Sequence, residues 1–255
     1  MNEHTTAQLL ITQDSAQLLQ DFNRELQPLL QRIVTHRYVQ ALEEGRVPRE
    51  ALKTLATQQY HIVSHGVQNI ALLLARYGDQ PSRKKLNEFL QAEFAVREAV
   101  LSFAEALGLS EAELRAAPMM LEAMMFSFYE TFVCLYGSDA DLITAFYFDA
   151  KVWIANAMRV SRALQTHYGF SREAARFFEM YANYQPRDED VLPYIQSALE
   201  RGAALGDCPG CKPDELGLQL ALQRGVTAQQ IRESTRLLLE SEWHFWEAMA
   251  KVAGV

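Results

Sequence analysis

Apolar side chains recur three and four positions apart along almost the whole chain, which is the spacing of one face of an α-helix. Strand-like alternation of apolar and polar positions is scarce. The first apolar stripe predicts a helix over residues 15–44 and consists of Leu18, Leu19, Phe22, Leu26, Leu29, Leu30 and Ile33. The pattern therefore predicts an all-α protein.

Turn and capping residues divide the rest of the chain into further helices. Ser110 and Glu113 have the spacing of a capping box, and Pro186 lacks the amide that would continue a preceding helix. Helices are expected over 49–77, 82–107, 138–168, 171–183, 188–202 and 227–252, with another that ends at Gly137. No linker or repeat interrupts this series. We expect one domain over 1–255, a bundle of about seven to eight helices with a loosely packed N-terminus at residues 1–14.

Charge and composition narrow the class of partner. The chain has 32 acidic and 24 basic side chains, and its net charge of −8 repels phosphate, so no nucleic-acid partner is expected. No secretory signal and no membrane-spanning apolar run is visible, which predicts a cytoplasmic protein without a membrane partner. Cys208 and Cys211 have a spacing that suits zinc or redox chemistry. Because further zinc ligands are missing nearby, we expect an incidental or reversibly oxidised pair in a loop.

Two acidic residues stand within aromatic stretches of expected helices. Asp149 lies in AFYFDAKVWIANA and Glu242 in ESEWHFWEAM. A carboxylate in such surroundings is desolvated with a raised pKa, paired with a base, or bound to a metal. The alternative is that Asp149 faces solvent or pairs with Lys151, and that Glu242 lies at a solvated helix edge. If the two acids meet inside the bundle, their repulsion raises one pKa toward neutrality, which suits acid–base catalysis.

Aromatic residues could form walls for a flat ligand. Rings that would stack on a planar, nitrogen-bearing group belong to Phe126, Tyr147, Trp153, Tyr181 and Trp246. His61 and His65 are four positions apart and could chelate a metal, although ordinary core or surface histidines show the same spacing. The sequence has no phosphate-binding glycine loop, GxSxG or HExxH, which argues against nucleotide-loop enzymes, α/β-hydrolases and zincin proteases.

Several segments, taken in order, resemble the TenA-type thiaminase and PqqC families, which share the heme-oxygenase-like fold. The resemblance runs over about residues 30–250 and is carried by THRYVQALEEGRVPREALKTLATQQYHIVSH, FAEALGLSEAEL, YGSDADLITAFYF, FFEMYANY and EWHFW. It implies a heme-oxygenase-like bundle, a small-molecule ligand related to a cofactor or vitamin such as thiamine, and assembly as a homodimer or homotetramer.

The thiaminase pattern is only partly kept. Tyr181 and Glu242 match a pocket tyrosine and the catalytic glutamate of that family. The catalytic cysteine falls on Asp149, and the aspartate that holds the pyrimidine falls on Gln59. Other pocket tyrosines fall on Ile62, Phe126 and Trp153. Without a thiolate nucleophile, covalent hydrolysis of an aminopyrimidine is not expected, so the resemblance does not imply a standard thiaminase II.

A related branch with this fold contains non-haem di-iron oxidases. Glu93 matches one of their ligands and Asp149 falls on a second acid, but the late histidine–aspartate–histidine motif reads Tyr181, Gln185 and Asp188. Another ligand histidine is replaced as well. Iron or manganese would therefore have only a degenerate, oxygen-rich site, for which Glu93, Asp149, Gln185 and Asp188 are the candidates. We expect no resident cofactor.

Three functions stay open. The first is a small-molecule enzyme, a TenA-like hydrolase or PqqC-like oxidase, in which Asp149 and Glu242 are catalytic. Gln59 and the aromatic residues would bind its substrate, a heteroaromatic or amine-bearing metabolite. The second is an iron or manganese oxidase with a degenerate metal site. The third is a ligand-binding homologue without catalysis.

Overall fold

The structure is a computed structural model that describes the backbone of residues 3–206 and 227–255 and the side chains of residues 15–202 and 227–255. Every long element in these ranges is an α-helix, which confirms the all-α prediction. The helices are α1 (Glu3–Val34), α2 (Arg37–Glu43), α3 (Arg49–Arg76), α4 (Arg83–Glu105), α5 (Glu111–Ala116), α6 (Leu121–Tyr136), α7 (Asp139–His167), α8 (Leu192–Gly206) and α10 (Ala228–Ala253), with short 3₁₀ turns η1 (Arg176–Glu179) and η2 (Asp188–Asp190). The predictions about side-chain packing of residues 1–14 and about Cys208 and Cys211 lie outside the described residues.

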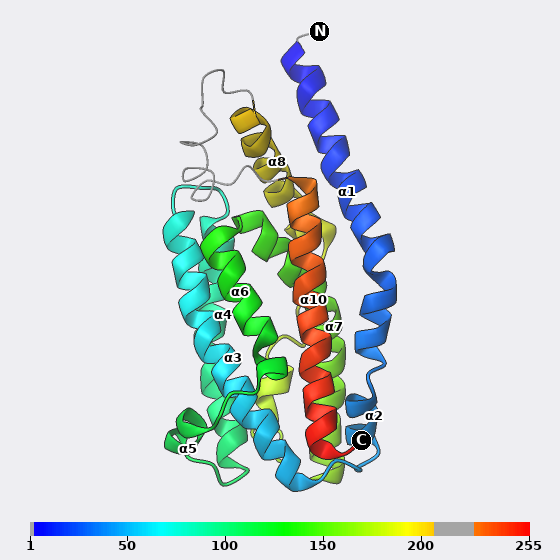
Figure 1. Cartoon of the computed structure of the whole chain (residues 1–255), viewed down its shortest axis with the longest axis vertical. Coiled ribbons are helices and arrows are strands. Elements are labelled where there is room, and N and C mark those ends of the chain that lie inside the picture. The colour runs from blue at the N-terminus through cyan, green and yellow to red at the C-terminus, as the bar shows by residue number, and fades with distance from the viewer. Residues whose placement is uncertain (1–2, 207–226) are drawn as a thin grey trace.

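The long helices stand side by side as a bundle (Figure 1). α3 packs against α4 and α6, and α10 packs against α6 and α7. α1 packs on α10, α8 and α7, and α2 lies at the same end of the bundle as the C-terminus. Helices that are far apart in the sequence therefore share one interior.

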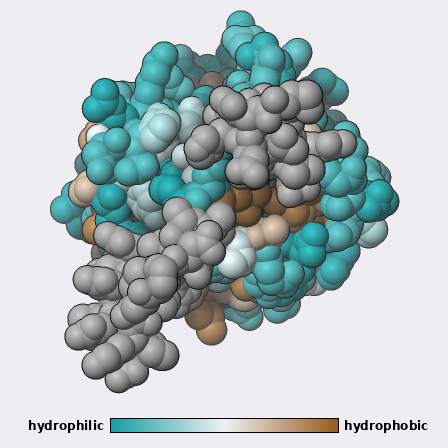
Figure 2. All heavy atoms as spheres, turned by 90° about the horizontal axis from the view of Figure 1, so that it is seen from above, coloured by the Kyte–Doolittle hydropathy of each residue, from teal (hydrophilic) through white to brown (hydrophobic). Residues whose placement is uncertain are grey.

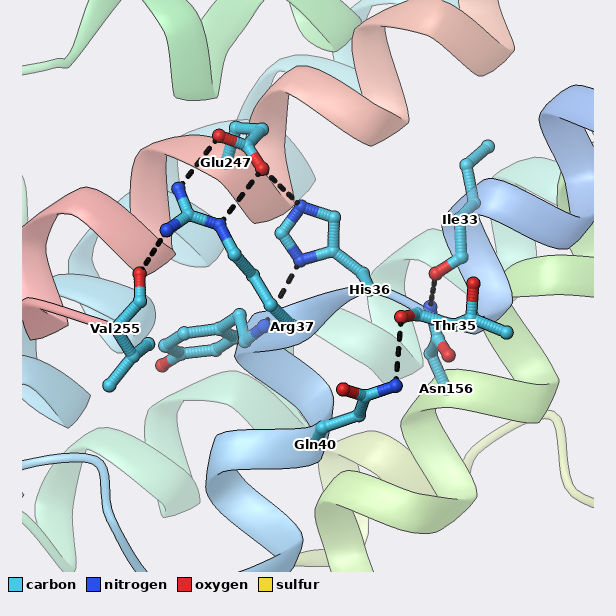
Figure 3. Close-up of polar contacts among 9 residues, drawn as sticks. Ile33, Thr35, His36, Arg37, Gln40, Asn156, Glu247 and Val255 are labelled. Atoms are coloured by element: carbon cyan, nitrogen blue, oxygen red, sulfur yellow. Dashed lines mark hydrogen bonds and ion pairs between the residues drawn. The ribbon is translucent and has the colours of Figure 1, made fainter.

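The prediction of one continuous helix over residues 15–44 is wrong, because the chain breaks at His36. This residue has extended backbone (φ −64°, ψ 136°), and its Nδ1 accepts a hydrogen bond from the amide of Tyr38 at 3.2 Å. Figure 3 shows its other ring nitrogen facing Glu247 of α10, 3.0 Å from Oε1. Arg37 donates to the same carboxylate at 2.9 Å and to the main-chain oxygen of Val255. The break is thus fixed by a distant helix, which local periodicity does not record.

The predicted helix over residues 171–183 is also wrong, because this segment forms turns around η1. Phe177 and Phe178 are consecutive and both buried, Phe177 against Trp153 and Phe178 against Phe103. A 3₁₀ turn separates adjacent side chains more widely than an α-helix does, so both rings can pack in different directions. Tertiary packing overrides the local helical pattern here.

Other predicted boundaries agree with the structure to within a few residues. Ser110, Ser138 and Thr227 each cap a helix through a complete capping box. The helix predicted to start after the Ser110 cap and to end at Gly137 is divided into α5 and α6. The helix predicted over 188–202 is divided into η2 and α8, with Pro193 in the first turn of α8, where its missing amide leaves no hydrogen bond unmade.

The outer surface has one unusual helix face. Apolar side chains on one side of α6 are 41–69% exposed, namely Leu121, Phe128, Phe132, Leu135 and Tyr136. Exposed apolar patches often mark contact surfaces. The assembly of this chain as a homodimer or homotetramer stays a prediction.

Figure 2 looks onto the end of the bundle that carries α8, where the rim is mostly hydrophilic and hydrophobic atoms are visible toward the middle. No helix within the described residues is long and apolar enough to cross a membrane.

Candidate functional site

An interior cavity of about 340 Å³ lies between α3, α4, α6, α7 and α10, with a further wall from the segment around η1 and η2. Its interior is acidic. Six acidic side chains line it. Two are Glu88 on α4 and Asp190 in η2, and we call the others the four cavity acids: Glu93 on α4, Glu130 on α6, Asp149 on α7 and Glu242 on α10. The sequence proposed Asp149 and Glu242 as catalytic residues, and the structure places both in this cavity.

The rim of the cavity carries the solvent-exposed polar groups. Glu88 is exposed near the start of α4, and Tyr184, which also lines the cavity, is 36% exposed. Among the described residues, Lys85 is the one basic side chain that lines the cavity, and its Nζ lies 3.2 Å from Glu88. Because Lys85 forms an ion pair with Glu88 at the rim, it does not pair with any of the four cavity acids.

Aromatic rings cover much of the wall between the acids. They belong to Phe89, Phe126, Phe146, Tyr147, Trp153, Phe177, Tyr181, Tyr184 and Phe245. Trp153 stacks on Trp246 at 5.9 Å between ring centroids, with 24° between the ring planes. Trp246 lies behind this wall and does not line the cavity, unlike the other aromatic residues predicted for the site. Gln59, also predicted, is buried and lines the α3 side.

Burial and mutual repulsion change the acidity of the four cavity acids. An ordinary aspartate or glutamate side chain has a pKa of about 4. Burial raises the pKa of Glu93 to about 7 and that of Asp149 to about 7. Burial, reinforced by the negative charges of Glu93 and Asp149, raises the pKa of Glu130 to about 8. These groups therefore titrate near neutral pH.

Asp149 and Glu242, the pair expected from the sequence, influence one another directly. Burial and then the charge of Asp149 raise the pKa of Glu242 well above its ordinary value. Trp246 opposes this in part, because its indole N–H donates to Oε1 of Glu242 at 2.7 Å. One oxygen of Asp149, Oδ1, is buried without a partner. The cavity thus holds a carboxyl group with an unused hydrogen-bonding position.

Glu130 was missed by the sequence analysis. Asn69 of α3 donates to its Oε2 at 3.3 Å, while Oε1 is buried without a partner. A signal did exist, because Glu130 is the single charged residue of MMFSFYETFVCLYG, the most apolar stretch among the predicted helices. Gly66, also on α3, makes room for Glu93: a Cβ there would lie 3.1 Å from Oε2 of that residue.

The metal candidates are not brought together. Glu93 and Asp149 line the cavity, but Gln185 and Asp188 are exposed and do not line it. Asp188 instead accepts a hydrogen bond from the hydroxyl of Tyr147. Within the described part of the chain, no group of three or more His, Cys, Asp or Glu side chains is placed to hold a metal ion. The iron or manganese implied by the oxidase resemblance therefore does not fit these residues.

Histidine and cysteine side chains also lie outside the cavity wall. His61 bonds to the carbonyl of Ala117 at 2.9 Å, and Nδ1 of His65 lies 3.0 Å from the hydroxyl of Ser127. Cys134 is buried in α6, and burial raises the pKa of its thiol. Among the described residues, no histidine or cysteine lines the cavity, and the titratable side chains that do are carboxyl groups, tyrosines and Lys85.

Known proteins share this architecture and part of its sequence pattern. A family model described as the TENA/THI-4/PQQC family matches residues 23–192. A TenA homologue from Pseudomonas syringae pv. tomato str. DC3000 is 17% identical, with 92% of this chain and 93% of that chain covered and a TM-score of 0.68. A TenA homologue from Pyrococcus furiosus is 18% identical, with 91% and 99% covered and a TM-score of 0.62.

A third solved structure carries the name of the fold. It is a domain of unknown function with a heme oxygenase-like fold from Shewanella denitrificans OS217, 15% identical, with 93% of this chain and 96% of that chain covered and a TM-score of 0.56. No curated protein matches the chain significantly. The solved structures confirm the heme-oxygenase-like fold that the sequence predicted.

Proposed function

The chain belongs to the TENA/THI-4/PQQC family, and on that premise we propose that it binds a small, planar, nitrogen-bearing metabolite in the cavity and transforms it by acid–base chemistry. The observation that carries the proposal is the gathering of the four cavity acids between aromatic walls. Buried carboxyl groups favour ligands that donate hydrogen bonds or carry positive charge, as amines and protonated ring nitrogens do. Aromatic walls favour a flat ring.

The charge of the site disfavours anionic substrates. A phosphate or carboxylate group inside the cavity would be repelled by those cavity acids that are ionised, and no unpaired cation lines the described wall to offset the repulsion. The nearest basic group of the wall, Lys85, pairs with Glu88 at the rim. We therefore expect a neutral or cationic substrate that is not phosphorylated.

The two predicted catalytic acids have complementary roles in this proposal. Asp149, with a pKa of about 7, accepts a proton near neutral pH. Burial and the charge of Asp149 raise the pKa of Glu242, so this side chain keeps its proton. It therefore serves as the general acid or as a hydrogen-bonding clamp. Trp153, supported from behind by Trp246, provides the face on which the substrate ring stacks.

The test uses two isosteric substitutions, Asp149→Asn and Glu242→Gln. A library of heteroaromatic amines is first screened against the wild-type protein by thermal shift, and the affinity of each ligand found is measured for both variants. We expect losses of roughly tenfold or more in affinity and, for a ligand that is turned over, roughly a hundredfold in rate. Glu105→Gln is the matched control, because Glu105 is exposed at the end of α4.

Two outcomes would contradict this function. If every ligand binds the variants as it binds the wild type, the two acids do not form the site. If affinity falls in the variants but no bound ligand is ever chemically changed by the wild type, the protein is a ligand-binding homologue and the catalytic part of the proposal is wrong.

A further inference from the structure

The two carboxyl oxygens of Glu130 have different surroundings. The residue is only 2% exposed. Asn69 donates to Oε2 at 3.3 Å, whereas Oε1 is buried and has no partner. Glu130 lines the cavity, and Oε1 is the oxygen whose hydrogen-bonding capacity is unused. A buried polar atom without a partner is uncommon and indicates a missing partner.

The orientation of Asn69 decides which oxygen accepts. Its Nδ2 also points to the carbonyl of Ser127 at 3.5 Å, and an amide nitrogen, unlike an amide oxygen, can donate to that carbonyl. The hydroxyl of Thr131 lies 3.0 Å from Oδ1 of Asn69 on the other side. The amide nitrogen therefore faces Glu130, and Oε2 is the accepting oxygen.

The groups around Glu130 favour its neutral form. Glu93 on α4 and Asp149 on α7 face it with negative charge, Glu242 on α10 lines the same cavity, and Cys134 lies one turn further along α6. The partner from α3 is the uncharged amide of Asn69. Burial, with the charges of Glu93 and Asp149, raises the pKa of Glu130 to about 8 despite the opposing hydrogen bond from Asn69, so the side chain keeps its proton at neutral pH. With Oε2 accepting from Asn69, the proton resides on Oε1.

We propose that Glu130 is a specificity-determining residue whose neutral Oε1–H donates a hydrogen bond to an uncharged acceptor on the ligand, such as a ring nitrogen or a carbonyl oxygen. The inference rests on the proposed function, since it concerns the same cavity. It adds a requirement: the ligand presents an acceptor toward α6 as well as donors toward Asp149 and Glu242. A ligand that lacks the acceptor leaves a buried O–H unpaired and binds roughly tenfold more weakly.

The experiment uses nicotinamide and benzamide as probes. They share size, shape and the amide group, and they differ in one ring nitrogen, an acceptor that is uncharged at neutral pH. Ligand-observed NMR titrations at millimolar concentration compare the wild type with Glu130→Gln and Glu130→Leu. We expect the wild type to prefer nicotinamide by roughly tenfold. Glu130→Gln keeps the preference, because its amide N–H replaces the acid O–H, and Glu130→Leu loses it.

Several results would overturn the proposal. They are equal affinity of the two probes for the wild type, binding of neither probe, or loss of the preference in Glu130→Gln, which would indicate that the preference does not come from a hydrogen-bond donor at this position. Asp149→Asn and Glu242→Gln are titrated in parallel. If they bind both probes as the wild type does while the preference is present, the proposed function fails and the assignment of Glu130 stands.

A spectroscopic measurement covers the case in which Glu130→Leu does not fold. The infrared spectrum of the wild type at neutral pH should contain the C=O stretch of a protonated carboxyl group that is missing from Glu130→Gln. Glu105→Gln, altered at an exposed position, should keep that band. A spectrum in which wild type and Glu130→Gln share all protonated carboxyl bands would show that Glu130 is ionised and would overturn the proposal.

Discussion

Glu242 and Glu247 lie on the same helix, little more than one turn apart, and are held in opposite ways. Glu247 accepts from Arg37 at 2.9 Å and lies 3.0 Å from His36 (Figure 3), and these partners, Arg37 first, lower the pKa of its carboxyl group. Glu242 faces the cavity, where burial and the charge of Asp149 raise its pKa. Glu247 is thus an anion held between helices by His36 and Arg37, and we call these three residues the clamp. Glu242 keeps its proton because, among the described residues, no basic side chain lies beside it.

The difference separates structural from functional use of the same residue type. At the clamp, each donor has an acceptor, so the interaction stabilises the fold. In the cavity, the acids repel one another and some of their oxygens are unpartnered, which lowers stability. Such uncompensated groups occur where a ligand is to complete the hydrogen bonding.

The largest effect is expected in the pH dependence of stability at Glu130. Its folded-state pKa of about 8 exceeds the unfolded value of about 4.3, so its contribution is fully present below about pH 4 and is lost as the pH rises toward 8. Glu130→Gln cannot titrate. We expect the variant to be more stable than the wild type by on the order of 5 kcal/mol at about pH 8 and by almost nothing at about pH 4.

Urea unfolding over this pH range measures the effect, with Glu105→Gln as the control for a glutamate-to-glutamine change at an exposed position. The control should follow the wild-type curve. If the free energies of unfolding of Glu130→Gln and the wild type run parallel from acid to alkaline pH, Glu130 is not held as an acid.

Glu247→Ala tests the clamp and should have the next largest effect. It leaves the buried Nε2–H of His36 without an acceptor and Arg37 without its ion pair. We expect the free energy of unfolding at neutral pH to fall by about 2 kcal/mol. Because the folded pKa of Glu247 is lowered, its stabilisation is present above the ordinary glutamate pKa and is lost as the pH falls through the folded value. The cost of the substitution therefore shrinks in acid. The effect of Glu130→Gln also shrinks in acid, but it has the opposite sign, a gain in stability.

Glu247→Gln sharpens this result, since it keeps an acceptor for His36 but removes the charge beside Arg37. Urea unfolding should place it between the wild type and Glu247→Ala. A loss as large as that of the alanine variant would show that the ion pair, rather than the hydrogen bond to His36, holds the two helices together.

Sequence reasoning reached the fold and part of the cavity for identifiable reasons. Helix periodicity and capping residues such as Ser138 are local, and they predicted most helices. Asp149 and Glu242 were proposed because a charged residue within an aromatic stretch is visible in one dimension. The break at His36 depends on Glu247, more than two hundred positions away, so no local pattern contains it.

The same limit applies to the wall of the cavity. Because Trp246 shares a helical face with Glu242, we predicted that Trp246 lines the cavity. In the structure, Trp153 stacks on Trp246 and lines the cavity in its place. Glu130 stood out in an apolar helix, but its importance depends on Asn69 across the helix interface. Contacts between helices, unlike the helices themselves, are set by packing in three dimensions.

Trp246→Phe should have a smaller effect than the clamp substitution. The phenyl ring keeps most of the packing on Trp153 but removes the N–H that donates to Glu242 at 2.7 Å. We expect a loss of about 1 kcal/mol in the free energy of unfolding. Because that hydrogen bond lowers the pKa of Glu242, its removal should shift the pH profile of ligand binding to higher pH. Trp243→Phe, in the same turn of α10 but with its ring under Arg32, should leave the profile unchanged.

Gly66→Ala should have the smallest effect on stability, while it should still lower ligand affinity. Alanine favours a helix over glycine by about 1 kcal/mol, but the new Cβ would lie 3.1 Å from Oε2 of Glu93, which must move by a few tenths of an ångström. We expect the two effects to cancel to within about 0.5 kcal/mol, while displacement of a cavity acid lowers ligand affinity severalfold. Ala71→Gly, at an exposed position of α3, measures the helix term alone. Unchanged affinity in Gly66→Ala, with stability raised by the full helix term, would mean that Glu93 moves freely and takes no part in shaping the cavity.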